Sequence, residues 1–145
     1  YLIAAGRRWF ELWVPHDPDA WARPKLVFRD ISSEPCFWLD FAGTVVNGDC
    51  YWLTSARGDE HELWLAAAVA NSSFITTFYD RTFNNRLYAG RRRFITQYVQ
   101  HFPIPNPASS IGLELVAAAR RMYVEPSPAL LREIDTLVNR AFGLS

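Results

Sequence analysis

The sequence has few of the residues that mark a secreted, disulfide-linked or membrane-spanning protein. It holds 2 cysteines, Cys36 and Cys50, which are too few for a framework of disulfides and favour a reducing, cytoplasmic location. The longest apolar run, residues 64–70, falls far short of the roughly 20 residues that a membrane span needs. We therefore expect two small buried thiols and no membrane partner.

The motifs that carry catalysis or cofactor binding are also missing. The 7 glycines are scattered, so the sequence has neither a glycine-rich phosphate loop nor a nucleophile elbow. The 3 histidines, His16, His61 and His101, stand alone, without a second His or Cys at a metal-ligand spacing. These absences argue against a small hydrolase or an ion-dependent enzyme, and we expect no catalytic residue, metal or cofactor in the chain.

Lysine is almost absent, because Lys25 is the only one among the 15 cationic side chains. The others are arginines, whose planar guanidinium forks suit phosphate and guanine. The net charge is +0, but its distribution is uneven. Residues 76–107 carry five arginines against Asp80 alone, whereas residues 1–75 carry six cations against ten acids. Such a basic segment can act as an electrostatic footprint for a polyanion.

A hydrophobic content of 50% with 21% charged residues is typical of a folded chain of this length. The first 57 residues alternate short apolar stretches with turn residues, which predicts a twisted antiparallel β-sheet. The dipeptide Asn47-Gly48 predicts a hairpin that joins residues 44–46 to residues 50–54. The expected strands are residues 8–14, 25–31, 36–41 and 50–54.

Helix formers at helical spacing dominate after residue 58. The expected helices cover residues 62–70, 74–82, 91–101, 111–124 and 129–142, and a proline-rich connector at residues 103–107 precedes the last two. Residues 87–90 are expected to be extended and exposed. The pattern predicts an α+β fold with the sheet in the N-terminal half, helices following and a C-terminal helical pair. We assign residues 1–107 to one domain and residues 108–145 to a helical extension that packs on it.

The basic segment is the best candidate site that the residues alone provide. Residues 88–94 place three consecutive arginines after a glycine and beside a tyrosine. Guanidinium groups bind backbone phosphates and can fork onto guanine. The alternative is a solvated face whose arginines form salt bridges with the acidic N-terminal half, and the composition does not decide between the two.

Several stretches, in this order and spacing, resemble the TaqI-like C-terminal specificity domain of adenine-N6 DNA methyltransferases, including single-chain type II restriction-modification enzymes. Residues 8–10 and 24–31 are similar to the family's opening, and residues 46–53 to a later strand, from which Asp49-Cys50 departs. Residues 65–79 are similar to its helix pair. Residues 90–105 resemble its arginine, tyrosine and proline segment, and residues 133–144 its closing motif.

The resemblance implies a module that docks beside a methyltransferase domain, binds double-stranded DNA and reads its sequence while the target adenine is flipped. The S-adenosylmethionine site would belong to the parent enzyme, which fits the lack of an Asn-Pro-Pro-Tyr/Phe motif here. Because the sequence starts at Tyr1 with residues typical of an interior segment, we interpret it as a piece of that parent. The expected DNA-binding residues are Lys25, Arg29, Arg81, Arg86, Tyr88, Arg91, Arg92 and Arg93.

Most of the matched motifs are expected to be scaffold, since such domains differ most where they read bases. Lys25 and Arg29 lie in a matched strand, where they could face phosphate or stabilise the sheet. A second hypothesis is a structural or protein-interaction module of a multi-subunit enzyme, without direct DNA contact. Failure to bind any duplex, together with binding to the catalytic domain, would favour that hypothesis.

Overall fold

The computed structural model describes residue 6, residues 17–46, 48–84 and 86–144. A three-stranded antiparallel sheet in the order β3-β1-β4 forms its N-terminal half. The central strand β1 (Lys25–Arg29) pairs with β3 (Phe37–Asp40) on one side and β4 (Cys50–Leu53) on the other, so that Phe28 lies opposite both Phe37 and Tyr51. The short helix α1 (Pro18–Ala22) precedes β1, and the Asp17 side chain caps its first turn.

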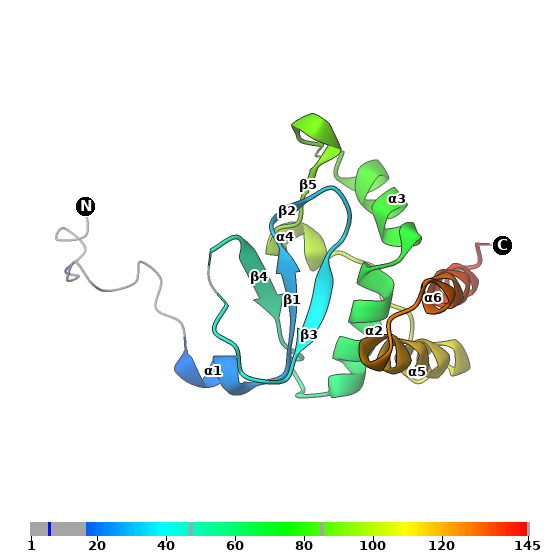
Figure 1. Cartoon of the computed structure of the whole chain (residues 1–145), viewed down its shortest axis with the longest axis horizontal. Helices are drawn as coiled ribbons and strands as arrows, with labels where there is room; N and C mark the ends of the chain where they lie inside the picture. Colours follow the sequence, from blue (N-terminus) through cyan, green and yellow to red (C-terminus); the bar gives the residue numbers. More distant parts are fainter. Residues whose placement is uncertain (1–5, 7–16, 47, 85, 145) are drawn as a thin grey trace.

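A second, two-stranded sheet extends from the end of β1. In it β2 (Ile31–Ser32) pairs antiparallel with β5 (Arg92–Arg93), which comes much later in the chain. The backbone N–H of Phe94 donates to the carbonyl of Asp30 over 2.6 Å and continues this pairing. The small sheet therefore ties the basic segment directly to the upper end of the main sheet (Figure 1).

One face of the main sheet is covered by α2 (Glu60–Ala70), which begins where the Asp59 carboxylate accepts from the N–H of His61 over 2.8 Å. The helix α3 (Ser73–Thr82) follows after Asn71. The short segments η2 (Tyr88–Gly90) and α4 (Thr96–Val99) come next. The core lies between sheet and helices, where Phe28, Leu65 and Phe94 have no exposed surface.

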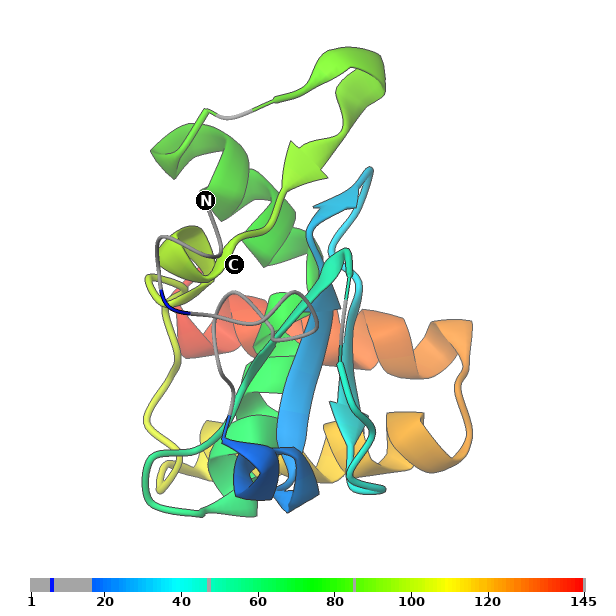
Figure 2. The ribbon, with the colours of Figure 1, turned by 90° about the vertical axis from the view of Figure 1, so that its left-hand side faces the viewer.

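The C-terminal pair, α5 (Ser110–Val124) and α6 (Pro128–Ala141), forms a further layer against α2, as Figures 1 and 2 show from two sides. The hydroxyls of Ser109 and Ser127 accept from backbone N–H groups and cap the two helices. Gly112 allows α5 to begin close to the proline connector, because a Cβ there would collide with the carbonyl oxygen of Asn106. The α+β class, with its N-terminal antiparallel sheet and C-terminal helical pair, is confirmed.

Three of the expectations for local structure are wrong. β4 pairs with β1, whereas residues 44–46 form no strand, so the hairpin across Asn47-Gly48 is not formed. The expected helix at residues 91–101 is reduced to α4, because Arg92 and Arg93 are held in β5. Residues 87–90 are not extended throughout, since Tyr88–Gly90 makes a turn of 3-10 helix. The expected strand at residues 8–14 lies outside the described residues.

Candidate nucleic-acid interface

The basic segment forms a narrow hairpin at residues 86–92, which we call the arginine hairpin. An antiparallel bridge joins Arg86 to Arg92, and the N–H of Leu87 donates to the carbonyl of Arg91 over 2.8 Å. Its tip is the turn Tyr88–Gly90, in which Ala89 and Gly90 have φ values of 60° and 70°. Figures 1 and 2 both show it projecting beyond the rest of the molecule, next to the end of α3.

The carboxylate of Asp80, on α3, anchors both sides of the hairpin. It accepts from Arg92 through Nε at 2.7 Å and Nη2 at 2.8 Å, and it also accepts from Arg86. Hydrogen bonds from Arg92 first and Arg86 second hold the pKa of Asp80 well below its usual range. A further guanidinium N–H of Arg92 donates to the carbonyl of Ser33. With only 11% of its side chain exposed, Arg92 serves to fix the hairpin.

Two further contacts hold the strand that leaves the hairpin. Asp30 accepts from Arg93 Nε over 3.1 Å, and the buried hydroxyl of Tyr79 donates to the backbone carbonyl of Arg93 over 2.7 Å. Burial raises the pKa of Tyr79 to about 12, so this hydroxyl keeps its proton at neutral pH. The hairpin is therefore fixed at its base by one tyrosine and two carboxylates.

Other cationic groups near the hairpin are open to solvent. Arg81, in the last turn of α3, and Arg91, on the hairpin, are exposed and form no ion pair within the described residues. Arg29, at the end of β1, is also exposed. Arg86 and Arg93 are paired, yet 59% and 49% of their side chains remain accessible.

Lys25 does not belong to this surface. Its side chain has no exposed area, and its ammonium group lies 2.6 Å from Asp40 and 2.7 Å from the carbonyl of Trp21. Burial acts to raise the pKa of Asp40, but hydrogen bonds from Lys25, Ala42 and Thr44 together hold that pKa below its ordinary value. Of the two roles considered for Lys25, stabilising the sheet is the one that this geometry supports, so we remove it from the expected interface.

The arginines of the basic segment fall into two groups, those held in ion pairs and those left open to solvent. Arg93 pairs with Asp30 of the acidic N-terminal half, as the salt-bridge alternative expected, whereas Arg92 pairs with Asp80 of the basic segment itself. Arg91 and Arg81 are exposed and have no ion-pair partner among the residues that the structure describes. The anchoring roles of Asp80, Asp30 and Tyr79 were not foreseen, although Asp80 stands out in the sequence as the only acid of the basic segment.

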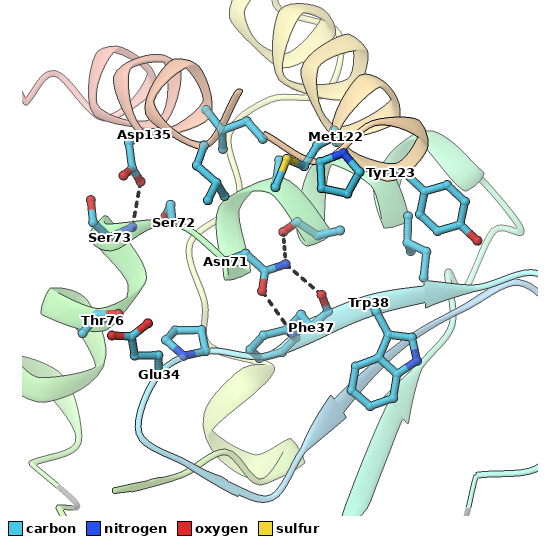
Figure 3. Close-up of a pocket in the computed structure, with 18 of the residues that line it drawn as sticks. Glu34, Phe37, Trp38, Asn71, Ser72, Ser73, Thr76, Met122, Tyr123 and Asp135 are labelled. Atoms are coloured by element: carbon cyan, nitrogen blue, oxygen red, sulfur yellow. Dashed lines mark hydrogen bonds between the residues drawn. The ribbon is translucent and has the colours of Figure 1, made fainter. Parts of the chain in front are cut away.

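A groove of about 980 Å³ opens elsewhere on the molecule, between β3, the α2–α3 junction and the C-terminal helices (Figure 3). The Asn71 side chain spans one wall, because its amide accepts from the N–H of Phe37 at 3.0 Å and donates to the carbonyl of the same residue at 2.9 Å. Asp135 of α6 accepts from the N–H of Ser73 over 2.8 Å. The sequence interpretation did not foresee this groove.

The histidines show no catalytic arrangement in the part of the chain that is described. His61 and His101 are exposed, and His16 lies outside that part. No group of three or more His, Cys, Asp or Glu side chains within the described ranges could hold a metal ion. None of the described helices is both long and apolar enough to pass through a bilayer.

The described part of the chain thus consists of a sheet, its covering helices and a projecting arginine hairpin. A family model, described as the TaqI-like C-terminal specificity domain, matches residues 3–104, and the chain belongs to this family. The "Type II methyltransferase M.BanIII" of Aneurinibacillus aneurinilyticus is 36% identical to it over 150 residues. That match covers 99% of this chain and 26% of the relative, so the chain spans about a quarter of the relative's length.

Proposed function

We propose that the chain is the DNA sequence-recognition domain of an adenine-N6 DNA methyltransferase. It binds duplex DNA and positions the target adenine for a catalytic domain that lies outside these residues. The parent enzyme uses S-adenosylmethionine, and the chain itself carries out no chemistry. Endonuclease activity of the same parent is a separate prediction, as is the boundary between a recognition domain at residues 1–107 and a helical extension at residues 108–145.

The arginine hairpin is the observation that carries this proposal. Phosphate contacts fix the register of a protein on a duplex, and they need cations that are not already neutralised by the protein. Arg91 and Arg81 meet that condition, and Arg29 lies at the start of the β2–β5 sheet that supports the hairpin. Binding by this chain alone is expected to be weak, because the catalytic domain, which we expect to hold the DNA from the other side, is absent. It is also expected to depend strongly on salt, because contacts to phosphates release counterions.

The experiment is a titration of the 145-residue chain with a fluorescent duplex, followed by anisotropy at several salt concentrations. Each phosphate contact contributes about 0.9 to the slope of log Kd against log salt. Arg91→Ala should therefore weaken binding and reduce the slope by about 1, with Arg81→Ala acting in the same way. Arg92 and Arg93 are poorer probes, because replacing them also releases the base of the hairpin.

The matched control is Arg132→Ala, which removes an exposed guanidinium group of α6 that forms no ion pair within the described residues. It should leave the affinity and the slope unchanged. If Arg91→Ala behaves like Arg132→Ala, Arg91 is not in the interface. If the unmodified chain binds no duplex even at low salt, the proposed function is wrong.

The groove supports a second part of the proposal, namely contact with the methyltransferase domain of the parent chain. Trp38 and Leu131 line the groove and are 41% and 44% exposed, which is typical of a surface that another protein covers. The named relative is a methyltransferase that extends far beyond the matched segment. Cys36 is exposed and Cys50 is half-buried, so the expectation of two buried thiols is wrong. Both thiols are free, which is compatible with the reducing cytoplasm, where we place the parent.

This contact can be tested by mixing the chain with a separately expressed catalytic domain of its parent. Leu131→Asp should abolish co-migration in gel filtration, because it places a charge in the apolar groove, and should leave DNA binding intact. The control Leu113→Asp alters a leucine of α5 that is 51% exposed and does not line the groove. Association with the catalytic domain without any duplex binding would favour an interaction module that does not touch DNA.

A further inference from the structure

Tyr88 occupies the tip of the arginine hairpin with 84% of its surface exposed. Its side chain has no hydrogen bond or ring contact with any residue of the described ranges, although many aromatic rings of the chain pack against one another in the core. A ring in that position contributes nothing to the packing of the fold. The ring is therefore available for contact with another molecule, and an exposed tyrosine can offer both an apolar face and a hydroxyl group.

The backbone beneath Tyr88 is held in a defined position. The bridge between Arg86 and Arg92 closes the hairpin, and Asp80 binds both of these arginines. Tyr79, with no exposed surface, holds the strand that follows through the carbonyl of Arg93. A side chain on such a support loses little further freedom when it makes a contact, which favours specific binding.

The turn itself is conformationally unfavourable for its sequence. Ala89 has a φ of 60°, in the left-handed region that residues with a Cβ rarely adopt. Strained residues of this kind persist where the surrounding structure imposes them, and they are frequent at functional sites. Here the strain has a geometric result, since Ala89 and Gly90 reverse the chain immediately after Tyr88 and leave Tyr88 in the turn at the end of the hairpin.

We propose that Tyr88 contacts the bases of the bound DNA and contributes to the choice of sequence. This inference rests on the proposed DNA-recognition function and adds a specificity-determining residue to it. A two-stranded ribbon fits the major groove of B-DNA, which is roughly 12 Å wide. With the arginine hairpin in that groove, Tyr88 meets base edges and ring faces, whereas Arg91 beside it meets the phosphates at the groove margin.

Loss of Tyr88 and loss of Arg91 should therefore affect DNA binding in different ways. Tyr88 carries no charge, so its loss releases no counterions and leaves the salt dependence of binding unchanged. Its loss removes contacts that only the preferred sequence provides in full, so the preferred site suffers more than other sequences. Arg91 behaves in the opposite way, because its loss weakens binding to every duplex by a similar factor and lowers the salt slope.

The experiment begins with selection of a preferred duplex from a random library by the unmodified 145-residue chain. The Kd for that duplex and for a scrambled one is then measured for Tyr88→Ala, Tyr88→Phe and the control Leu113→Ala, at several salt concentrations. Melting temperatures are recorded for each variant. Tyr88 lacks contacts within the described residues, so its replacement should leave the melting temperature unchanged.

Tyr88→Ala should weaken binding to the selected duplex by at least about fivefold, in line with the effect of removing one aromatic contact to a base. Binding to the scrambled duplex and the salt slope should stay as they are. Tyr88→Phe should retain most of the preference because the ring remains, and Leu113→Ala should retain all of it.

Three results would overturn the inference. In the first, Tyr88→Ala keeps the ratio of the two Kd values. In the second, the control Leu113→Ala loses as much preference as Tyr88→Ala, which would show that the effect is not particular to the tip of the hairpin. Both leave the proposed function standing, since the unmodified chain still selects a sequence. In the third, the unmodified chain binds no duplex, and the proposed function fails together with the inference.

Discussion

Cations meet carboxylates in two contrasting regions of this molecule. At the lower end of the sheet, Lys25 and Asp40 form a pair in which the lysine is fully buried. At the base of the arginine hairpin, Asp80 binds Arg86 and Arg92, and 59% of the Arg86 side chain is accessible. The first pair stabilises the interior, whereas the second holds a projecting surface element in place.

The difference follows from the positions of the residues rather than from their charge. Lys25 begins the central strand, which has a strand on either side and whose residues Lys25–Phe28 are all buried. The hairpin arginines lie on a two-stranded extension outside that core. A cation in a matched sequence motif is therefore a contact candidate only where the fold leaves it accessible.

The interior pair should show the largest effect when it is broken. Lys25→Met leaves the Asp40 carboxylate without its cation in a buried position, which is expected to reduce the free energy of unfolding by about 3 kcal/mol or more. Urea denaturation of the chain measures this loss. The double variant Lys25→Met, Asp40→Asn should recover part of it, and a double variant as unstable as the single one would show that the pair is not the cause.

The hairpin pair should matter less to global stability and more to local order. Asp80→Asn removes the charge that binds Arg86 and Arg92, with an expected loss of about 1–2 kcal/mol. The amide proton of Leu87, which donates across the hairpin, should exchange much faster in this variant. The control is Asp49→Asn, which changes an exposed carboxylate in the loop before β4. Equal exchange rates of the Leu87 amide proton in the two variants would contradict the anchoring role of Asp80.

The two regions should also share a response to acid. The folded pKa values of Asp80 and Asp40 are lowered, so their contributions to stability are fully present above the ordinary aspartate pKa near 3.9 and are lost as the pH falls through the folded values. Melting temperatures between about pH 6 and pH 2 should fall less steeply for Asp80→Asn than for the unmodified chain. Parallel curves would show that Asp80 is not held ionised by the arginines.

The smallest effect is expected at the surface pair that Arg121 of α5 makes with Glu133 of α6 over 2.8 Å. Both side chains are largely in solvent, where screening and lost side-chain entropy offset the attraction. Glu133→Gln should leave the melting temperature unchanged at physiological salt. A drop as large as that of Asp80→Asn would show that exposure does not separate structural from dispensable pairs in this chain.

Local patterns predicted α2, α3, α5 and α6, because caps and apolar spacing act within one element. The residues that end or begin α2, α5 and α6 include such signals, for example Ser109 and Ser127 as caps. Strand pairing could not be predicted in the same way. The Asn47-Gly48 dipeptide predicts only a local turn. In the structure β4 pairs with β1, where Tyr51 packs against Phe28 across the strands.

The sequence predicted which segment carries the candidate site, but not which of its arginines are ion-paired and which are accessible. Five arginines in one stretch revealed where cations gather. Which of them stay free depends on Asp30, which lies some sixty residues earlier, and on Asp80 and the buried Tyr79 of α3. Such long-range partners leave no periodic or spacing signal in a single sequence.

Asn71 has a consequence for how this sheet meets other chains. Strand β3 is at the margin of the sheet, and a marginal strand offers open backbone groups on which further strands can add, chain upon chain. The Asn71 amide takes up both backbone groups of Phe37 and so stands where the next strand would begin. One side chain at the end of a helix thereby obstructs the start of any fourth strand at this margin, and with it a route to aggregation.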